Sequence, residues 1–167
     1  MEKISDALVI IDLQKGVCFG EQTIDHFNDL ITLVNQRIKL YRDQDKPILF
    51  IQHCDEDLIP NSAAWEIVDE LARKDSDIVI QKTHANSFYH TDLQKVLQQQ
   101  QINKLEICGA QTQYCIDTTV KFAHGLGYQL TMLKNASTTY ANRFLSAADT
   151  IAFYENIWDK RFLHLIQ

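Results

Sequence analysis

The stretch Ala7-Leu8-Val9-Ile10-Ile11-Asp12 is an unbroken aliphatic run that ends at a carboxylate. A run of this length without polar alternation is typical of a strand buried on both faces, as in the parallel sheets of α/β proteins. Further strand-like runs follow at 47–51, 77–80, 105–108 and 128–133. The fold class therefore depends on what connects these runs.

The connecting segments carry the apolar spacing of amphipathic helices, in which every third or fourth residue is apolar. The spacing is clearest from Thr23 to Tyr41, where Thr23 is the expected N-cap. Other helices are expected at 65–71, 91–101, 114–126 and 146–158, with a last edge strand at 162–166. Because parallel strands need crossover connections, this alternation predicts a single α/β domain over residues 1–167. We expect a doubly wound, mainly parallel, Rossmann-like sheet with helices on both faces.

Composition narrows the possible functions of the 167-residue chain. The 22 acidic residues outnumber the 16 Lys and Arg residues, and the net charge of −6 argues against nucleic acid as a partner. We expect no membrane partner, because no apolar run is long enough to cross a bilayer and no secretory segment is visible. The four cysteines form no C-x-x-C pair, so we expect free thiols and a cytoplasmic location. There is no G-x-G-x-x-G or P-loop motif, and no cofactor is expected.

Three reactive side chains follow the ends of predicted strands: Asp12, Lys82 and Cys115. The carboxyl ends of parallel strands meet at one edge of the sheet, which is where ligands bind in this fold class. A helix N-terminus and a nearby ammonium favour the thiolate of Cys115, a carboxylate at Asp12 moves protons, and Lys82 keeps Asp12 ionised. Each residue alone has an ordinary explanation, as a loop carboxylate, a solvated lysine or a buried thiol. Only their convergence indicates catalysis.

The sequence around these residues resembles the isochorismatase-like cysteine hydrolases, a family that includes nicotinamidases and N-carbamoyl amidases. Residues 9–14 resemble the opening strand and D-x-Q motif of the family, and residues 82–88 resemble its segment with lysine followed by S-x-F. Residues 109–119 resemble its nucleophile motif G-x-x-T-x-x-C-x-x-x-T. The resemblance extends over nearly the whole chain.

The resemblance implies a role for each of these residues. Asp12 is the implied acid and base, Lys82 its electrostatic partner, and Cys115 the nucleophile. It also implies a cis peptide bond between Ala110 and Gln111, with the N–H groups of Gln111 and Cys115 directed at an oxyanion. Members of the family usually assemble as dimers or tetramers, so the resemblance implies a homo-oligomer.

Two departures from the family pattern bear on metals and on substrate. Nicotinamidases bind a metal through an Asp-x-His pair, which the loop His53-Cys54-Asp55-Glu56-Asp57 lacks. His53, Asp55, Asp57 and His84 only approximate a site, and we expect no metal. Asn135 stands where the family often has Asp. The loops at 15–22, 53–64 and 136–145 are expected to shape the substrate pocket, with Gln14, Phe19 and Trp65 as candidate lining residues.

These expectations combine into one hypothesis, the hydrolysis of an amide-type C–N bond in a small molecule through a thioester on Cys115. Two alternatives stay open. One is vinyl-ether hydrolysis of an isochorismate-type substrate, in which acid catalysis by Asp12 matters and the thiol is not essential. The other is a non-catalytic binder of small molecules on the same fold.

Overall fold

A parallel sheet forms the centre of the computed structural model, which describes residues 4–167. Its strands are β1 (Ala7–Ile11), β2 (Ile48–His53), β3 (Ile78–Lys82), β4 (Lys104–Ala110), β5 (Gln129–Leu133), β6 (Ser137–Thr138) and β7 (His164–Ile166). They lie in the order β3-β2-β1-β4-β5-β7, β6 pairs with β4, and the pairings are parallel. The predicted fold class is confirmed.

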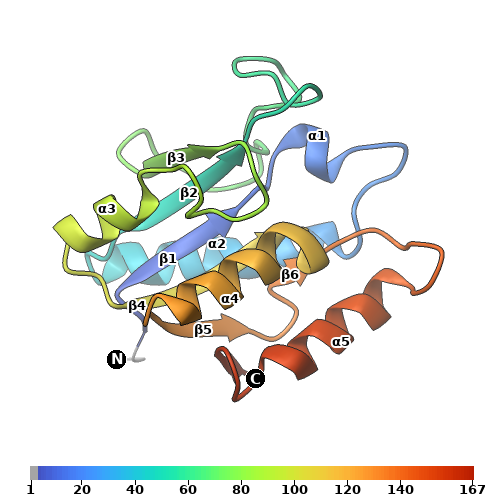
Figure 1. Cartoon of the computed structure of the whole chain (residues 1–167). Helices are drawn as coiled ribbons and strands as arrows, with labels where there is room; N and C mark the ends of the chain where they lie inside the picture. Colours follow the sequence, from blue (N-terminus) through green and yellow to red (C-terminus); the bar gives the residue numbers. More distant parts are fainter. Residues whose placement is uncertain (1–3) are drawn as a thin grey trace.

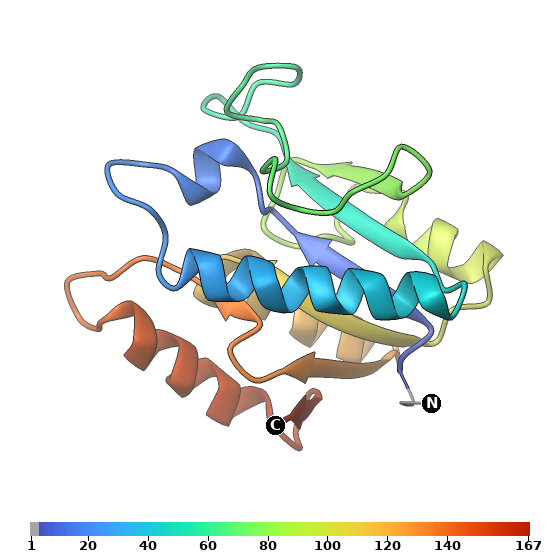
Figure 2. The ribbon, with the colours of Figure 1, turned by 180° about the vertical axis from the view of Figure 1, so that it is seen from behind.

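Helices cover both faces of this sheet. The helical segments are α1 (Lys15–Cys18), α2 (Phe27–Asp43), α3 (Leu93–Gln99), the π-helical turn η1 (Thr112–Ile116), α4 (Asp117–Gly125) and α5 (Ala147–Trp158). Figure 1 shows α3 and α4 on the near face, and Figure 2 shows α2 crossing the opposite face. With both faces covered, all five residues of β1 are buried, which explains its continuous aliphatic sequence. None of these helices is long and apolar enough to cross a membrane.

The prediction of a helix at 65–71 is wrong. This segment is an irregular chain that pairs with the residues after β1: Lys15 N donates to Glu66 O at 2.8 Å, and Val68 N donates to Leu13 O at 3.0 Å. The apolar side chains of Val68 and Leu71 are still buried. Backbone pairing with a neighbouring segment has replaced helical hydrogen bonding, a choice that apolar spacing alone does not reveal.

The helix expected from Thr23 also begins later than expected, at Phe27, and Thr23 is not its cap. His26 precedes it in the left-handed region, at φ 38°, and makes no side-chain cap. Thr23 instead pairs with Phe19 in an isolated antiparallel bridge. Two short elements, α1 and β6, were not expected, and the helix expected at 114–126 begins earlier, with the π-helical turn η1 at Thr112.

One buried ionic cluster ties helix α2 to the sheet. Arg37 donates from Nε and Nη2 to the two carboxylate oxygens of Glu106, at 2.7 and 2.8 Å, and Tyr41 donates from its hydroxyl to Glu106 Oε2 at 2.9 Å. All three side chains are buried. Both oxygens of the Glu106 carboxylate therefore have partners, and the charge is compensated where it lies.

Candidate active site

The end of β1 places Asp12 beside β4. Ile11 is paired with Gly109, and a Cβ at Gly109, where φ is +127°, would lie 2.1 Å from the carbonyl oxygen of Ile11. Glycine is thus required for the close approach of the two strands. Asp12 itself adopts a left-handed backbone, at φ 51°, an uncommon conformation that Asp tolerates better than most residues. The residue is only 2% exposed.

The end of β3 brings in Lys82, which is 1% exposed. Its ammonium donates to Asp12 Oδ2 at 2.7 Å, to His53 Nδ1 at 2.9 Å and to Cys115 Sγ at 3.2 Å. His53 lies beside it because the two residues are register partners in the pairing of β2 with β3. Since Nδ1 of His53 accepts from Lys82, the ring proton lies on Nε2, which is 3.1 Å from Asp55 Oδ2.

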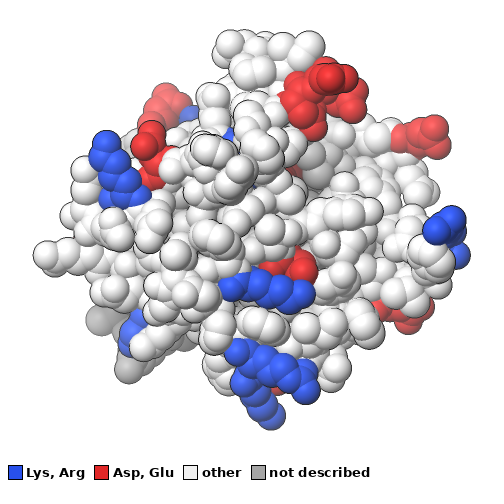
Figure 3. All heavy atoms as spheres, viewed as in Figure 1, with Lys and Arg blue, Asp and Glu red and all other residues white. Residues whose placement is uncertain are grey.

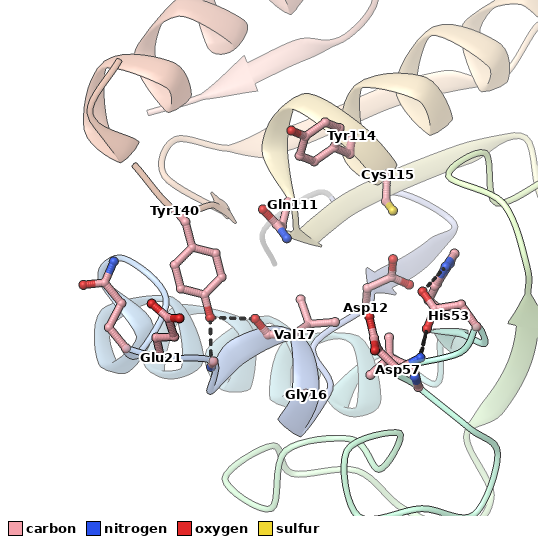
Figure 4. Close-up of a pocket in the computed structure, with 14 residues that line it drawn as sticks. Asp12, Gly16, Val17, Glu21, His53, Asp57, Gln111, Tyr114, Cys115 and Tyr140 are labelled. Atoms are coloured by element: carbon pink, nitrogen blue, oxygen red, sulfur yellow. Dashed lines mark hydrogen bonds and ion pairs between the residues drawn. The ribbon is translucent and has the colours of Figure 1, made fainter. Parts of the chain in front are cut away.

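The third candidate, Cys115, is half-buried in η1. Lys82 contacts both its sulfur and Asp12, although the three residues are separated by 70 and 33 positions in the sequence. The structure therefore brings together the three side chains that the strand ends predicted. Figure 4 shows Cys115 directed toward Asp12 and His53 across one cavity.

The resting protonation state differs from the sequence expectation of a thiolate. Burial raises the pKa of the Cys115 thiol to about 12, the negative charge of Asp12 raises it too, and Lys82 only partly opposes them. Burial also raises the pKa of Asp12 above its ordinary value, against the lowering effect of Lys82. The sulfur therefore keeps its proton at rest, beside a carboxylate whose basicity burial has increased.

One oxygen of this carboxylate has no partner. Asp12 Oδ2 accepts from Lys82, whereas Oδ1 is buried without a hydrogen bond to any of residues 4–167. A buried acceptor left unpaired is costly and therefore uncommon in folded proteins. Because Asp12 also lines a cavity, this oxygen is placed to accept a proton from a thiol or from a bound molecule.

The cavity has a volume of about 500 Å³, enough for a small molecule. It is lined by Asp12, Gly16, Val17, Gly20, Glu21, Gln22, His53, Asp55, Asp57, Leu58, Gln111, Tyr114, Cys115 and Tyr140. These residues confirm that the loops 15–22, 53–64 and 136–145 supply its walls. The strand ends supply its base, where Asp12 and His53 lie (Figure 4).

The three expected lining residues lie elsewhere, and this part of the expectation is wrong. Gln14 is fully buried, Phe19 packs edge-on against the ring of Phe27 at 4.9 Å, and Trp65 donates to Cys54 Sγ at 3.3 Å. The spacing of residues along the chain does not show which side chains face a cavity.

Gln14 nevertheless supports the site from behind. Its side-chain amide accepts from His53 N at 2.7 Å and donates to His53 O at 3.0 Å and Trp65 O at 2.9 Å. Gln14 thus clamps the end of β2, which carries His53, to the loop around Trp65. We assign Gln14 a positioning role.

The ammonium of Lys82 lies among three side chains that could otherwise hold a metal ion. Asp12, His53 and Cys115 offer ligand atoms that all lie within 4.8 Å of one another. The ammonium of Lys82 is already within 3.2 Å of all three and supplies the positive charge there. His84, the fourth residue considered for a metal, stacks edge-on with Tyr89 at 4.8 Å and does not line the cavity.

The residues before Cys115 also reach the cavity. The peptide bond between Ala110 and Gln111 is cis, and Gln111 lines the cavity while its side chain accepts from Thr139 Oγ1 at 3.1 Å. Asn135 has a left-handed backbone, at φ 61°, which Asn and Asp both tolerate, and its N–H donates to Glu155 at 2.6 Å. Asn135 in place of the family's usual Asp is therefore compatible with the left-handed turn that follows β5.

The fold and the cavity together define a small α/β enzyme with its site at the carboxyl edge of the sheet. The isochorismatase domain family matches residues 6–153. A solved structure described as an isochorismatase family protein is 41% identical, with a TM-score of 0.94, and the match covers 96% of this chain and 97% of that one. The uncharacterized isochorismatase family protein YwoC of Bacillus subtilis (strain 168) is 31% identical over 154 residues, 81% of this chain and 79% of that protein. The chain belongs to the isochorismatase-like cysteine hydrolase family.

A shorter match names a chemical activity. The ureidoacrylate amidohydrolase RutB of Agrobacterium fabrum is 31% identical over 84 residues, which is 50% of this chain and 37% of that protein. The match covers only part of each protein. The amidohydrolase activity is therefore a property of RutB that the match does not by itself transfer to this chain.

Proposed function

We propose that the protein is a cysteine amidohydrolase that cleaves an amide-type C–N bond in a small molecule, without a cofactor. One observation carries the proposal: Lys82 joins the Cys115 sulfur to Asp12, whose second oxygen is unpaired at the cavity. A thiol with a base beside it and space for a carbonyl in front of it is the arrangement that nucleophilic catalysis requires. The amidohydrolase activity of RutB supports this choice of bond.

The chemistry follows from the positions of the protons. Asp12 Oδ1 takes the proton of Cys115 as the sulfur attacks the carbonyl carbon, and Lys82 stabilises the negative charge on both residues. The N–H groups of Gln111 and Cys115 hold the oxyanion. Asp12 then returns the proton to the leaving amine, which departs and leaves a thioester on Cys115.

Water completes the cycle. Asp12 accepts a proton from the water, hydroxide adds to the thioester, and the carboxylic acid leaves as Cys115 regains its proton. The net reaction is an amide plus water giving an acid plus an amine or ammonia. We further propose a cytoplasmic homo-oligomer acting on a small-molecule substrate, with no nucleic-acid or membrane partner.

Trapping the intermediate tests the proposal. The wild-type protein, quenched in acid during turnover of a panel of small amides, should gain the mass of one acyl group, and peptide mapping should place it on Cys115. Hydroxylamine should release it, and Cys115→Ser should give no hydroxylamine-sensitive thioester at this position. Turnover with no adduct on Cys115, or an adduct on another cysteine, contradicts this mechanism.

A further inference from the structure

The cavity walls carry an excess of negative charge. Four carboxylates line the cavity, those of Asp12, Glu21, Asp55 and Asp57, and within residues 4–167 no Lys or Arg lines it. Lys82 compensates Asp12 from behind. Figure 3 shows acidic side chains gathered at the upper right of the molecule, over the loop after β2 and near the loop after α1.

None of the other three carboxylates is paired with a Lys or Arg of residues 4–167. Within residues 4–167, neither Glu21 nor Asp57 forms an ion pair with a basic side chain. The Asp55 carboxylate accepts from the backbone N–H groups of Asp57 and Leu58 and contacts the ring of His53. Burial and the charge of Lys82 lower the pKa of His53, so this ring is neutral at pH 7. A molecule entering the cavity therefore meets three uncompensated negative charges before it reaches Cys115.

Two further features of the cavity favour a cation. The rings of Tyr114 and Tyr140 line it, and aromatic faces attract ammonium and guanidinium groups. The hydroxyl of Tyr140 donates to Val17 O at 2.8 Å, so this ring is held in place. At the base of the same cavity, Asp12 Oδ1 is a buried acceptor without a hydrogen bond from residues 4–167, so it can also accept an N–H of a bound amide.

From this charge distribution we infer that the substrate is a small amide carrying a positive charge, an ammonium or guanidinium group a few bonds from the amide. The inference rests on the proposed function and adds the substrate class to it. The amide lies between Cys115 and Asp12, and the cationic group lies against the carboxylates of Glu21, Asp55 and Asp57. A carboxylate-bearing amide of the same size is repelled by the same three groups.

Binding can be measured without turnover by using the Cys115→Ala variant and three amides of similar size. These are 4-aminobutanamide (cationic), butanamide (neutral) and succinamate (anionic), titrated at pH 7 and low ionic strength by calorimetry or NMR. We expect affinity to fall in that order, with about tenfold between the first and the last, and the difference to shrink in high salt. Binding of succinamate as tightly as 4-aminobutanamide, or no binding of 4-aminobutanamide at millimolar concentration, overturns the inference.

A matched pair of variants assigns the effect to the cavity. In the Cys115→Ala background, Asp57→Asn should weaken binding of 4-aminobutanamide about threefold and strengthen that of succinamate. Glu56→Gln removes the same charge from the neighbouring position of the loop, does not touch the cavity, and should change neither affinity. Equal effects of the two variants would show that only overall charge matters and overturn the inference.

Ammonia release by the wild-type protein separates this inference from the proposed function. Hydrolysis of butanamide and succinamate with no preference for the cationic amide refutes the substrate class and leaves the cysteine amidohydrolase standing. Preferred binding of 4-aminobutanamide with no ammonia released from any of the three amides supports the charge preference and contradicts the proposed function for these amides.

Discussion

Within residues 4–167, the buried ionic cluster at Glu106 and the one at Asp12 each pair a carboxylate with a basic side chain, but they differ in how far the carboxylate is satisfied. At Glu106, both carboxylate oxygens accept hydrogen bonds, from Arg37 and Tyr41, and Glu106 does not line the active-site cavity. At Asp12, the carboxylate accepts from Lys82 on one oxygen, the other is unpaired, and a cavity of about 500 Å³ opens beside it. Each cluster joins a strand to other elements far away in the sequence.

The difference shows how a buried charge serves structure in one place and chemistry in another. A carboxylate with all its acceptors occupied and its charge paired stabilises the packing of α2 on the sheet. An unpaired buried acceptor destabilises the resting state, because its desolvation is not compensated by a hydrogen bond. A hydrogen bond from a substrate, or a transferred proton, removes this destabilisation during the reaction. The first cluster should therefore control stability and the second activity.

The largest expected effect is on activity. Cys115→Ala should lower amide turnover by about 10⁴-fold or more, because the covalent step loses its nucleophile, while the half-buried site tolerates the loss of one sulfur atom. Steady-state kinetics with an amide found active on the wild-type protein, together with circular dichroism, measures both parts of this statement. Turnover retained in Cys115→Ala would favour the vinyl-ether chemistry, in which Asp12 acts as an acid without the thiol.

The next variant changes the Glu106 cluster and should affect stability rather than activity. Glu106→Gln removes the buried carboxylate charge that Nε and Nη2 of Arg37 contact, and the free energy of unfolding should fall by about 3–5 kcal/mol, with kcat per folded molecule unchanged. Urea denaturation and active-site titration make the comparison. Glu66→Gln is the matched control: it removes an exposed ion pair with Lys15, which also contacts Asp69, and should change the free energy of unfolding far less. A loss of kcat in Glu106→Gln would break the division between the two clusters.

The rates at which Cys108 and Cys115 react with a thiol reagent test whether the Asp12 cluster is open and the Glu106 cluster is not. Cys108 lies two positions after Glu106 in β4, is 2% exposed, and burial raises its pKa, whereas Cys115 is half-buried and faces the cavity. Iodoacetamide should therefore modify Cys115 about 100-fold faster than Cys108, which reacts only after local opening of the sheet. Peptide mapping of samples quenched over time gives the two rates. Equal, slow labelling of both cysteines would mean that the cavity gives the reagent no access to Cys115.

The contrast also explains which parts of the site are readable from sequence. The aliphatic run of β1 and the crossover rule place Asp12, Lys82 and Cys115 at one edge without any coordinates. The role of His53 as an acceptor for Lys82 depends on the register of β2 with β3, which no sequence pattern specifies.

Local spacing fails where the chain is irregular. Gln14 follows β1 like a pocket residue, yet the chain around 65–68 folds over it and buries it. The raised pKa of Cys115 depends on burial, so its helical position alone suggested the opposite direction. In each case a contact between distant segments decides the outcome, and such contacts leave no trace in apolar periodicity.

The smallest effect concerns the proton balance at His53. Burial, and then the charge of Lys82, lowers its pKa in the folded protein below the ordinary 6.5. As pH falls below 6.5, the unfolded chain binds a proton at this position that the folded protein does not, so the group removes stability on the acid side. Its contribution is fully favourable above pH 6.5 and is lost as pH falls, with a slope of at most about 1.4 kcal/mol per pH unit.

His53→Asn isolates this contribution, because an amide oxygen still accepts from Lys82 and does not titrate. Unfolding free energies between pH 5 and 7.5 should vary less with pH in His53→Asn than in the wild-type protein. An NMR titration of the His53 ring gives the same quantity directly. A value above 6.5 would mean that the carboxylates of Asp12 and Asp55 outweigh burial and Lys82, and the protonated ring would then compensate Asp55 in the cavity wall.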